Sequence, residues 1–234
     1  MTTSDLAERS LAFAREVQEL LDATIPGERT IVSVKQDDRY SVRPEGDSAK
    51  TRVIPLTVNG QHLAQLSVLL LQELDRTGEY LKTTRTDFRV LSTLDRTPLV
   101  RHEYRADMHT DPIAHWQFHA ERGSFSHLLS IAHAAGRVEN PHDLSNLHLP
   151  VGGERFRPCL EDLIEFLIRD CGIDHVHGWE RAVQAGREAW RRRQFRASVR
   201  DLQSEAAATL ADYGWRVEPP PEVRPEHVEP YRKW

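Results

Sequence analysis

The dipeptide Asn59-Gly60 constrains the fold of this chain more than any other feature. It separates two runs rich in aliphatic and β-branched residues, TRVIPLTV at 51–58 and QHLAQLSVLLL at 61–71. Asn-Gly supplies the two positive φ values of a type I′ turn, which joins antiparallel strands through a two-residue loop. Pro55 has no N–H to donate to a ladder, so its strand should lie at a sheet edge or carry a bulge.

Alternating and periodic apolar residues predict the remaining elements. Strands are expected at 30–35, 39–43, 86–94, 99–106 and 114–121, and an extended segment around a Gly-Gly turn at 146–158. Helices are expected at 4–22, 124–135, 158–171 and about 179–213. Strands followed by helices indicate an α+β fold, here an antiparallel meander sheet of about six or seven strands packed by an N-terminal helix and C-terminal helices.

The 234 residues divide into three expected parts. Residues 1–177 form the α+β domain, and residues 178–214 form a long Arg-rich helix that packs on it or extends from it. Residues 215–234 are a Pro-rich tail, expected to be extended and mobile. The long helix should bury a stripe of apolar side chains formed by Trp190, Phe195, Val199 and Leu202.

Composition excludes several classes of protein. With 39% hydrophobic residues the chain can bury a core, and a net charge of −5 argues against a general nucleic-acid coat, so any anion site must be local. No apolar run approaches the roughly 18 residues of a membrane span, and the N-terminus lacks the features of a secretory signal. A cytoplasmic location without membrane contact is expected. Cys159 and Cys171, twelve residues apart in one expected helix, should be small buried hydrophobes without a disulfide.

The stretch AHWQFHAER at 114–122 contains two histidines four residues apart. Its alternation predicts a strand, and four strand residues span roughly 13 Å, so His115 and His119 cannot share a metal ion by themselves. One face of this strand then carries polar side chains: His115, Gln117, His119 and Glu121. Trp116 and Phe118 point to the opposite face. We expect no bound metal and no cofactor.

The preceding strand carries Arg101, Glu103 and Arg105 on one face. If the two strands pair with apolar faces matched, these residues share a face with His115. Histidine, arginine and carboxylate are the groups of general acid–base catalysis on a phosphate ester. The candidate catalytic residues are Arg101, Arg105, His115, His119 and Glu121. A solvated face with cross-strand salt bridges and a simple binding face are the alternatives.

Two arginine-rich segments are candidates for anion binding. Arg155 and Arg157 follow the Gly-Gly turn, where backbone N–H groups and guanidinium groups can hold an anion, although a simple hairpin is also possible. The long helix supplies the remaining candidates for nucleic-acid backbone contact: Arg187, Arg191, Arg192 and Arg196. Alternatively, this helix pairs with acidic surfaces of its own protein or of a partner.

Residues 99–169 resemble the TumE-like toxins of bacterial toxin–antitoxin modules. The resemblance rests on the strand VRHEYRAD, the histidine-bearing strand AHWQFHAE, and the stretch ERFRPCLEDLIEFLI that enters an amphipathic helix. Only four of the 31 basic residues are lysine, a bias typical of a GC-rich bacterial genome. The resemblance implies a toxin- or defence-type role, acting on RNA, with an antitoxin-like protein as partner.

Two functions follow as hypotheses. The first is an effector that acts on nucleic acid, as a metal-independent RNase-like protein or an RNA-binding protein. The second is a non-enzymatic module for protein interaction or oligomerisation, including a homodimer formed through the long helix.

Overall fold

The Asn59-Gly60 turn has the backbone that its sequence predicts. Asn59 and Gly60 have φ values of 51° and 76°, and they join β3 (Ile54–Val58) to β4 (Gln61–Leu74) in antiparallel register. Strand β3 pairs with β4 alone, and its register shifts directly after Leu56. The proline strand is therefore an edge strand with an irregular ladder, which confirms the expectation drawn from Pro55.

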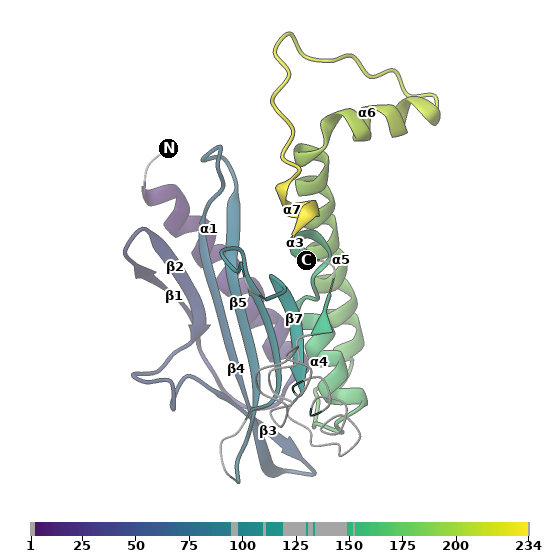
Figure 1. Cartoon of the computed structure of the whole chain (residues 1–234). Helices are drawn as coiled ribbons and strands as arrows, with labels where there is room; N and C mark the ends of the chain where they lie inside the picture. The colour runs from purple at the N-terminus through teal and green to yellow at the C-terminus, as the bar shows by residue number, and fades with distance from the viewer. Residues whose placement is uncertain are drawn as a thin grey trace.

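The computed structural model describes residues 3–94, 98–109, 111–118, 130, 133, 149–151 and 153–233. Within these residues one antiparallel sheet has eight strands, in the order β1-β2-β4-β5-β6-β7-β8 with β3 paired to β4. The further strands are β1 (Ile31–Gln36), β2 (Arg39–Pro44), β5 (Leu81–Ser92), β6 (Pro98–Arg105), β7 (Ala114–Phe118) and β8 (Leu149–Pro150). The predicted α+β meander is confirmed (Figure 1). Strand β5 starts earlier than expected because its first residues pair with the end of the long β4.

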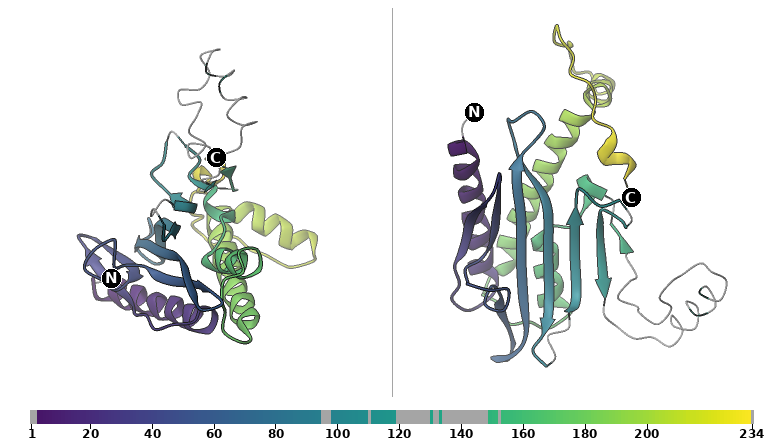
Figure 2. Two further views of the ribbon diagram at one scale, coloured as in Figure 1. Left: turned by 90° about the horizontal axis from the view of Figure 1, so that it is seen from below. Right: turned by 60° about the vertical axis from the view of Figure 1, so that its left-hand side comes forward.

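Helices cover one face of this sheet, as the views in Figure 2 show. The helices over the sheet include α1 (Thr3–Thr24), α4 (Leu160–Arg169) and α5 (Trp179–Asp201). The other described helices are α3 (Gly153–Phe156), α6 (Gln203–Asp212) and α7 (Glu229–Arg232). Helix α4 buries five side chains at helical spacing, at positions 160, 163, 164, 167 and 168. They pack in one core with alternate residues of β4, namely Leu66, Val68 and Leu70. None of the described helices is long and apolar enough to cross a membrane.

The expected single helix at 179–213 is instead two helices. The backbone leaves helical geometry at Leu202, with φ −126° and ψ 68°, and α6 leads away from α5 (Figure 1). The carbonyl of Asp201 accepts a hydrogen bond of 2.8 Å from the His227 N–H. That carbonyl is therefore engaged by the C-terminal segment, which explains the break. The C-terminal segment is also not fully extended, because it ends in α7 with Pro230 buried.

The prediction that the long helix buries an apolar stripe is also wrong. Phe195 is 70% exposed and Val199 lies on the surface as well. Helix α5 buries Trp179 and Val183 near its start and Asp201 at its end. Its middle therefore rests on the protein through polar contacts and small side chains rather than through a continuous apolar stripe.

The expected extended segment around residue 155 needs correction. Residues 153–156 form the helical turn α3 rather than an extended hairpin. Charged contacts explain the turn: the Arg157 side chain donates to the carbonyl of Glu154, and Arg155 lies between Glu154 and Asp201.

Cys159 is buried as expected, but Cys171 is exposed because α4 ends before it. The helix expected at 124–135 lies outside the described residues except Ser130 and His133, which are helical.

The burial of His102, on β6, predicts that the folded protein loses stability at acidic pH. The His102 side chain is 1% exposed, with the rings of Phe88 and Trp116 centred 5.8 and 4.9 Å away. Burial, with the nearby charge of Arg157, lowers the pKa of His102 to about 3. The unfolded chain takes up this proton below about pH 6.5 and the folded protein does not, so stability falls with pH between those values by up to ~1.4 kcal/mol per unit.

We expect His102→Phe to remove this contribution. Urea unfolding at pH 7, 5.5 and 4.5 should show a shallower loss of unfolding free energy in this variant than in the wild type. His62→Phe, at an exposed position, serves as the control and should keep the wild-type slope. A His102→Phe slope equal to that of the wild type would contradict the assignment.

Candidate functional site

Alternate residues of β5, β6 and β7 place charged and polar side chains on the sheet face opposite the helices. The antiparallel register sets Glu103 opposite His115 and Arg101 opposite Gln117. The predicted pairing of these two strands is therefore confirmed. We call this set the polar sheet face, and its members are Arg85, Asp87, Arg89, Arg101, Glu103, Arg105, His115 and Gln117. The candidate residues His119 and Glu121 lie outside the described residues.

Ion pairs connect the polar sheet face across the strands. Asp87 accepts from Arg85 at 3.1 Å and from the Arg89 Nε at 2.6 Å. Glu103 lies 3.6 Å from the guanidinium of Arg89 and 4.0 Å from that of Arg101. The candidate Arg105 pairs with Asp107 at 3.3 Å, at the end of the strand. Each of these arginines therefore has a carboxylate neighbour, which offsets most of the positive charge of the face.

His115 is the most enclosed member of the polar sheet face, with 1% of its side chain exposed. Its Nδ1 donates to the carbonyl of Pro112 at 2.8 Å, which directs Nε2 toward the Glu103 carboxylate at 3.8 Å. A carbonyl thus orients the imidazole, and a carboxylate stands beside its other nitrogen. The same Glu103 carboxylate has Arg89 and Arg101 as neighbours, so the groups that can move a proton and stabilise a phosphate share this face.

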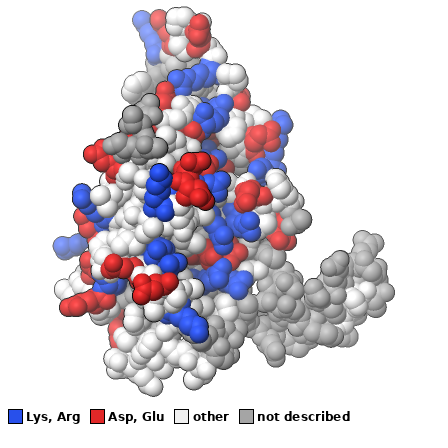
Figure 3. All heavy atoms as spheres, turned by 90° about the vertical axis from the view of Figure 1, so that its left-hand side faces the viewer, with Lys and Arg blue, Asp and Glu red and all other residues white. Residues whose placement is uncertain are grey.

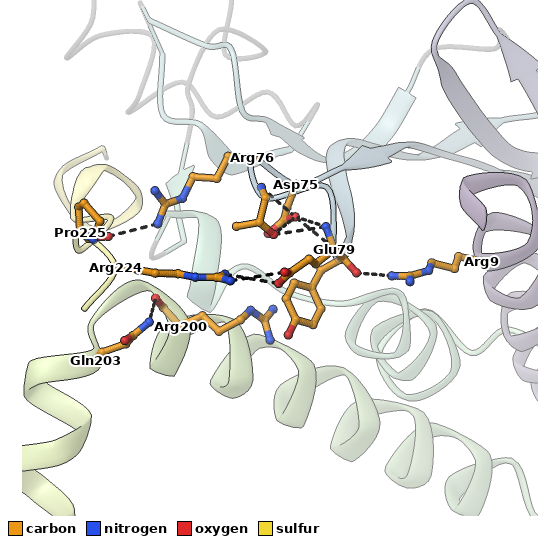
Figure 4. A network of polar contacts seen from close by, with 10 residues as sticks. Arg9, Asp75, Arg76, Glu79, Arg200, Gln203, Arg224 and Pro225 are labelled. Atoms are coloured by element: carbon orange, nitrogen blue, oxygen red, sulfur yellow. Dashed lines mark hydrogen bonds and ion pairs between the residues drawn. The ribbon is translucent and has the colours of Figure 1, made fainter. Parts of the chain in front are cut away.

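A second concentration of charge lies between the N-terminal helix α1, the β4–β5 turn, α5 and the C-terminal segment. Here the protein is hollowed into a cleft of about 570 Å³. Among its described lining residues, nine are Arg or Lys and four are Asp or Glu. We call it the basic cleft, and its cations are Arg9, Arg76, Lys82, Arg155, Arg157, Arg193, Arg196, Arg200 and Arg224. Figure 4 shows several of them approaching the β4–β5 turn from both sides.

Four cations of the basic cleft are held by carboxylates. Arg9 pairs with Asp5, Arg193 with Glu16, Arg224 with Glu79, and Arg155 with both Glu154 and Asp201. The other five have no carboxylate within 4 Å among the described residues: Arg76, Lys82, Arg157, Arg196 and Arg200. Arg200 lies over the ring of Tyr80 at 3.9 Å, and Arg76 donates to the carbonyl of Pro225.

Asp75 lies in the basic cleft without pairing with these five cations. Its Oδ1 accepts hydrogen bonds from Thr77, Glu79 and Tyr80, which fold the β4–β5 turn. Burial opposes ionisation, but these hydrogen bonds together lower the pKa of Asp75. The carboxylate is thus committed to the turn, and the basic cleft keeps an excess of positive charge.

The six arginines predicted to bind anions divide into two groups. Arg155, Arg157 and Arg196 line the basic cleft. The other three lie elsewhere on α5, where Arg187 binds Asp162 at 2.7 Å and also Glu165, Arg191 approaches Asp162 at 3.9 Å, and Arg192 pairs with Glu188. These three contact acidic residues of the protein itself, as the alternative interpretation expected.

Most cations of the basic cleft could not have been grouped from the sequence. Arg9, Arg76 and Arg224 come from three segments separated by more than sixty residues each, and no local motif connects them. On the side of the molecule seen in Figure 3, positive and negative side chains are interleaved, which fits the overall charge of −5. The positive excess is therefore a local property of the cleft.

Among the described residues, no group of three histidine, cysteine or acidic side chains is arranged to hold a metal ion. Comparison of the chain with protein-family models, curated proteins and solved structures finds no match.

Proposed function

We propose that this protein binds nucleic acid in the basic cleft and that its preferred ligand is single-stranded RNA. The observation that carries the proposal is the set of five cations without a carboxylate partner in a cleft that also presents Tyr80 and Trp190. Cationic side chains that follow a groove neutralise phosphates, and aromatic rings stack on bases. The combination is the one used to bind single strands with little dependence on sequence.

The size of the cleft favours a single strand over a duplex. About 570 Å³ lies within the range of sites that hold one drug-sized ligand. A single strand can insert a nucleotide or two into such a space while its neighbouring phosphates contact the other cations of the cleft, whereas a base-paired helix presents a much broader surface. The resemblance of residues 99–169 to toxins of toxin–antitoxin modules also supports RNA as the ligand.

Titration of a labelled single-stranded RNA with the protein at several salt concentrations tests the proposal. If five cations each displace counterions, the slope of log K against log[salt] should be about −3 to −4, since each neutralised phosphate in a single strand contributes roughly −0.7. Duplex RNA of the same sequence should bind more weakly. An absence of binding at 50 mM salt, or a slope near zero, would contradict the proposal.

RNA cleavage at the polar sheet face is a second candidate function. The observation that favours it is the His115 imidazole, oriented by Pro112 and placed beside Glu103, whose carboxylate also approaches two arginines. We expect the double variant His115→Ala/His119→Ala to lose RNA cleavage or toxicity by at least about 100-fold, the contribution of one general acid–base. His62→Ala is the matched control. Full activity in a folded double variant would contradict this function.

Binding of a protein partner is favoured by a different region. Helix α6 buries none of its residues, and the aromatic side chains that follow it, Tyr213 and Trp215, are 82% and 67% exposed. Large exposed aromatic side chains are enriched in protein interfaces. Light scattering for a homodimer and pull-down for an antitoxin-like partner test this function, and a strictly monomeric protein that retains no partner would count against it.

A further inference from the structure

We infer that the basic cleft recognises the end of a strand, with a terminal phosphate on Arg157 and the adjoining base in the apolar groove beside Trp190. This inference rests on the proposed function and specifies the ligand of the same cleft. It depends on two observations: the environment of Arg157, and a second hollow that continues from the cleft.

Arg157 is a buried cation that forms no ion pair within 4 Å among the described residues. Its side chain lies between the rings of Tyr104 and Trp190, 4.0 and 4.8 Å from their centres, and only 5% of the residue is exposed. It donates a hydrogen bond to the carbonyl of Glu154, and its Nε has no partner among the described residues. The Glu154 carboxylate itself is engaged by Arg155 at 2.9 Å.

A charge in this position is costly to bury without an anion. Burial lowers the pKa of Arg157, in agreement with a guanidinium that has lost its water. The two flanking rings stabilise the cation through their faces but leave its hydrogen-bonding edge unsatisfied. Because Arg157 lines the basic cleft, an anion that enters the cleft can complete this environment.

The apolar groove lies between α1 and α5 and has a volume of about 420 Å³. It shares four residues with the basic cleft: Phe13, Glu16, Trp190 and Arg193. Small side chains on α5 leave it open, since Ala182, Ala185, Gly186 and Ala189 line one wall. Leu70 and Phe88 of the sheet form its floor. A flat apolar ring that enters from the cleft would therefore reach a surface suited to a base.

A half-buried carboxyl group lies beside the apolar residues of the groove. Glu161 lines it, and burial raises the pKa of this carboxyl. Such a group keeps its proton to higher pH than an ordinary glutamate and can both donate and accept a hydrogen bond. Bases present both kinds of group on their edges, so Glu161 adds a polar contact for a base in the groove.

The depth of Arg157 favours a strand end over the middle of a strand. An internal phosphodiester could reach this buried group only if the chain entered and left the cleft floor. A terminal phosphate needs one connection, and it carries close to two charges at neutral pH. A guanidinium binds such a group through two parallel hydrogen bonds.

The test compares the affinity of one ten-nucleotide single-stranded RNA in three forms. One form carries a 5′ phosphate, one a 3′ phosphate, and one a hydroxyl at both ends. We expect one phosphorylated form to bind about tenfold tighter than the form without a terminal phosphate. The two phosphorylated forms show which end is recognised.

Variants show which residues produce the difference in affinity between the phosphorylated and hydroxyl-ended RNAs. Arg157→Met should reduce the ratio between the phosphorylated and hydroxyl-ended forms to about one, whereas Arg192→Met, outside the cleft, should keep it. Because Arg157 is buried and also contributes to packing, Ala189→Leu provides an independent test: it fills the groove from an exposed position and should lower affinity for every end-bound form. Ala208→Leu, an exposed position on α6, is its control.

Each outcome decides between the two proposals. Equal affinities of all three RNAs, with salt-dependent binding retained, would overturn the inference and leave the proposed function in place. Unchanged affinities in Ala189→Leu would overturn the placement of the base. An absence of RNA binding would overturn the proposed function and this inference together.

Discussion

Replacing Arg196 and Arg200 with glutamate is expected to weaken binding of single-stranded RNA by about 100-fold. Both side chains line the basic cleft, and neither has a carboxylate partner among the described residues. Each lost charge-assisted contact should cost about 1.5 kcal/mol or more, roughly a tenfold change in affinity. The salt slope should also fall by about 1.4, or 0.7 for each phosphate contact removed.

The same helix provides a matched control for this variant. Arg191→Glu/Arg192→Glu changes the net charge by the same amount, but these arginines lie outside the cleft and contact Asp162 and Glu188. Anisotropy titrations of both double variants against the same RNA separate a local effect from a general effect of charge. An equal loss of affinity in the two variants would show that net charge, and not the cleft, determines binding.

Replacing Arg155 with methionine is expected to lower the free energy of unfolding by about 3–5 kcal/mol. Arg155 binds Asp201 at 2.6 Å and Glu154 at 2.9 Å, and both Arg155 and Asp201 are largely buried. Burial alone would lower the pKa of Arg155, but the two carboxylates outweigh burial and raise this pKa. Without the guanidinium, Asp201 would retain His227, at 3.4 Å, as its one ion-pair candidate among the described residues.

Urea unfolding of two further variants checks this prediction. Arg155→Met/Asp201→Leu should recover part of the lost stability, because it removes the unpaired Asp201 charge, while Glu154 still lacks its Arg155 partner. Arg192→Met removes an exposed pair within one helix and should cost less than about 0.5 kcal/mol. A loss below 1 kcal/mol in Arg155→Met would show that Arg155 is not needed for stability and remains available to an anion.

The fold was predictable where short-range chemistry determines it. Asn59-Gly60 specified a turn, Pro55 an edge strand, and the apolar spacing after Pro158 a core helix. Strand alternation was also sufficient to place Glu103 and His115 on one face, because a shift by one residue would have buried the charged face.

Long-range contacts determine what the sequence could not predict. The break at Leu202 depends on a hydrogen bond from His227, and the helical turn at 153–156 depends on contacts with Asp201, more than forty residues away. The basic cleft likewise combines α1, the β4–β5 turn, α5 and the C-terminal segment. The sequence around a basic residue in one of these segments does not indicate that the other segments line the same cleft. The ion pair between Arg155 and Asp201 could not be inferred for the same reason.

Photo-crosslinking of a single-stranded RNA, followed by mass spectrometry of the adducts, tests the central claim most directly. Aromatic side chains that stack on bases are expected to form the adducts, and two of them, Tyr80 and Trp190, line the basic cleft. The account predicts adducts on the peptides that contain these two residues, and their loss in Arg196→Glu/Arg200→Glu. Adducts confined to the strands of the polar sheet face, or to the residues around Trp215, would contradict it.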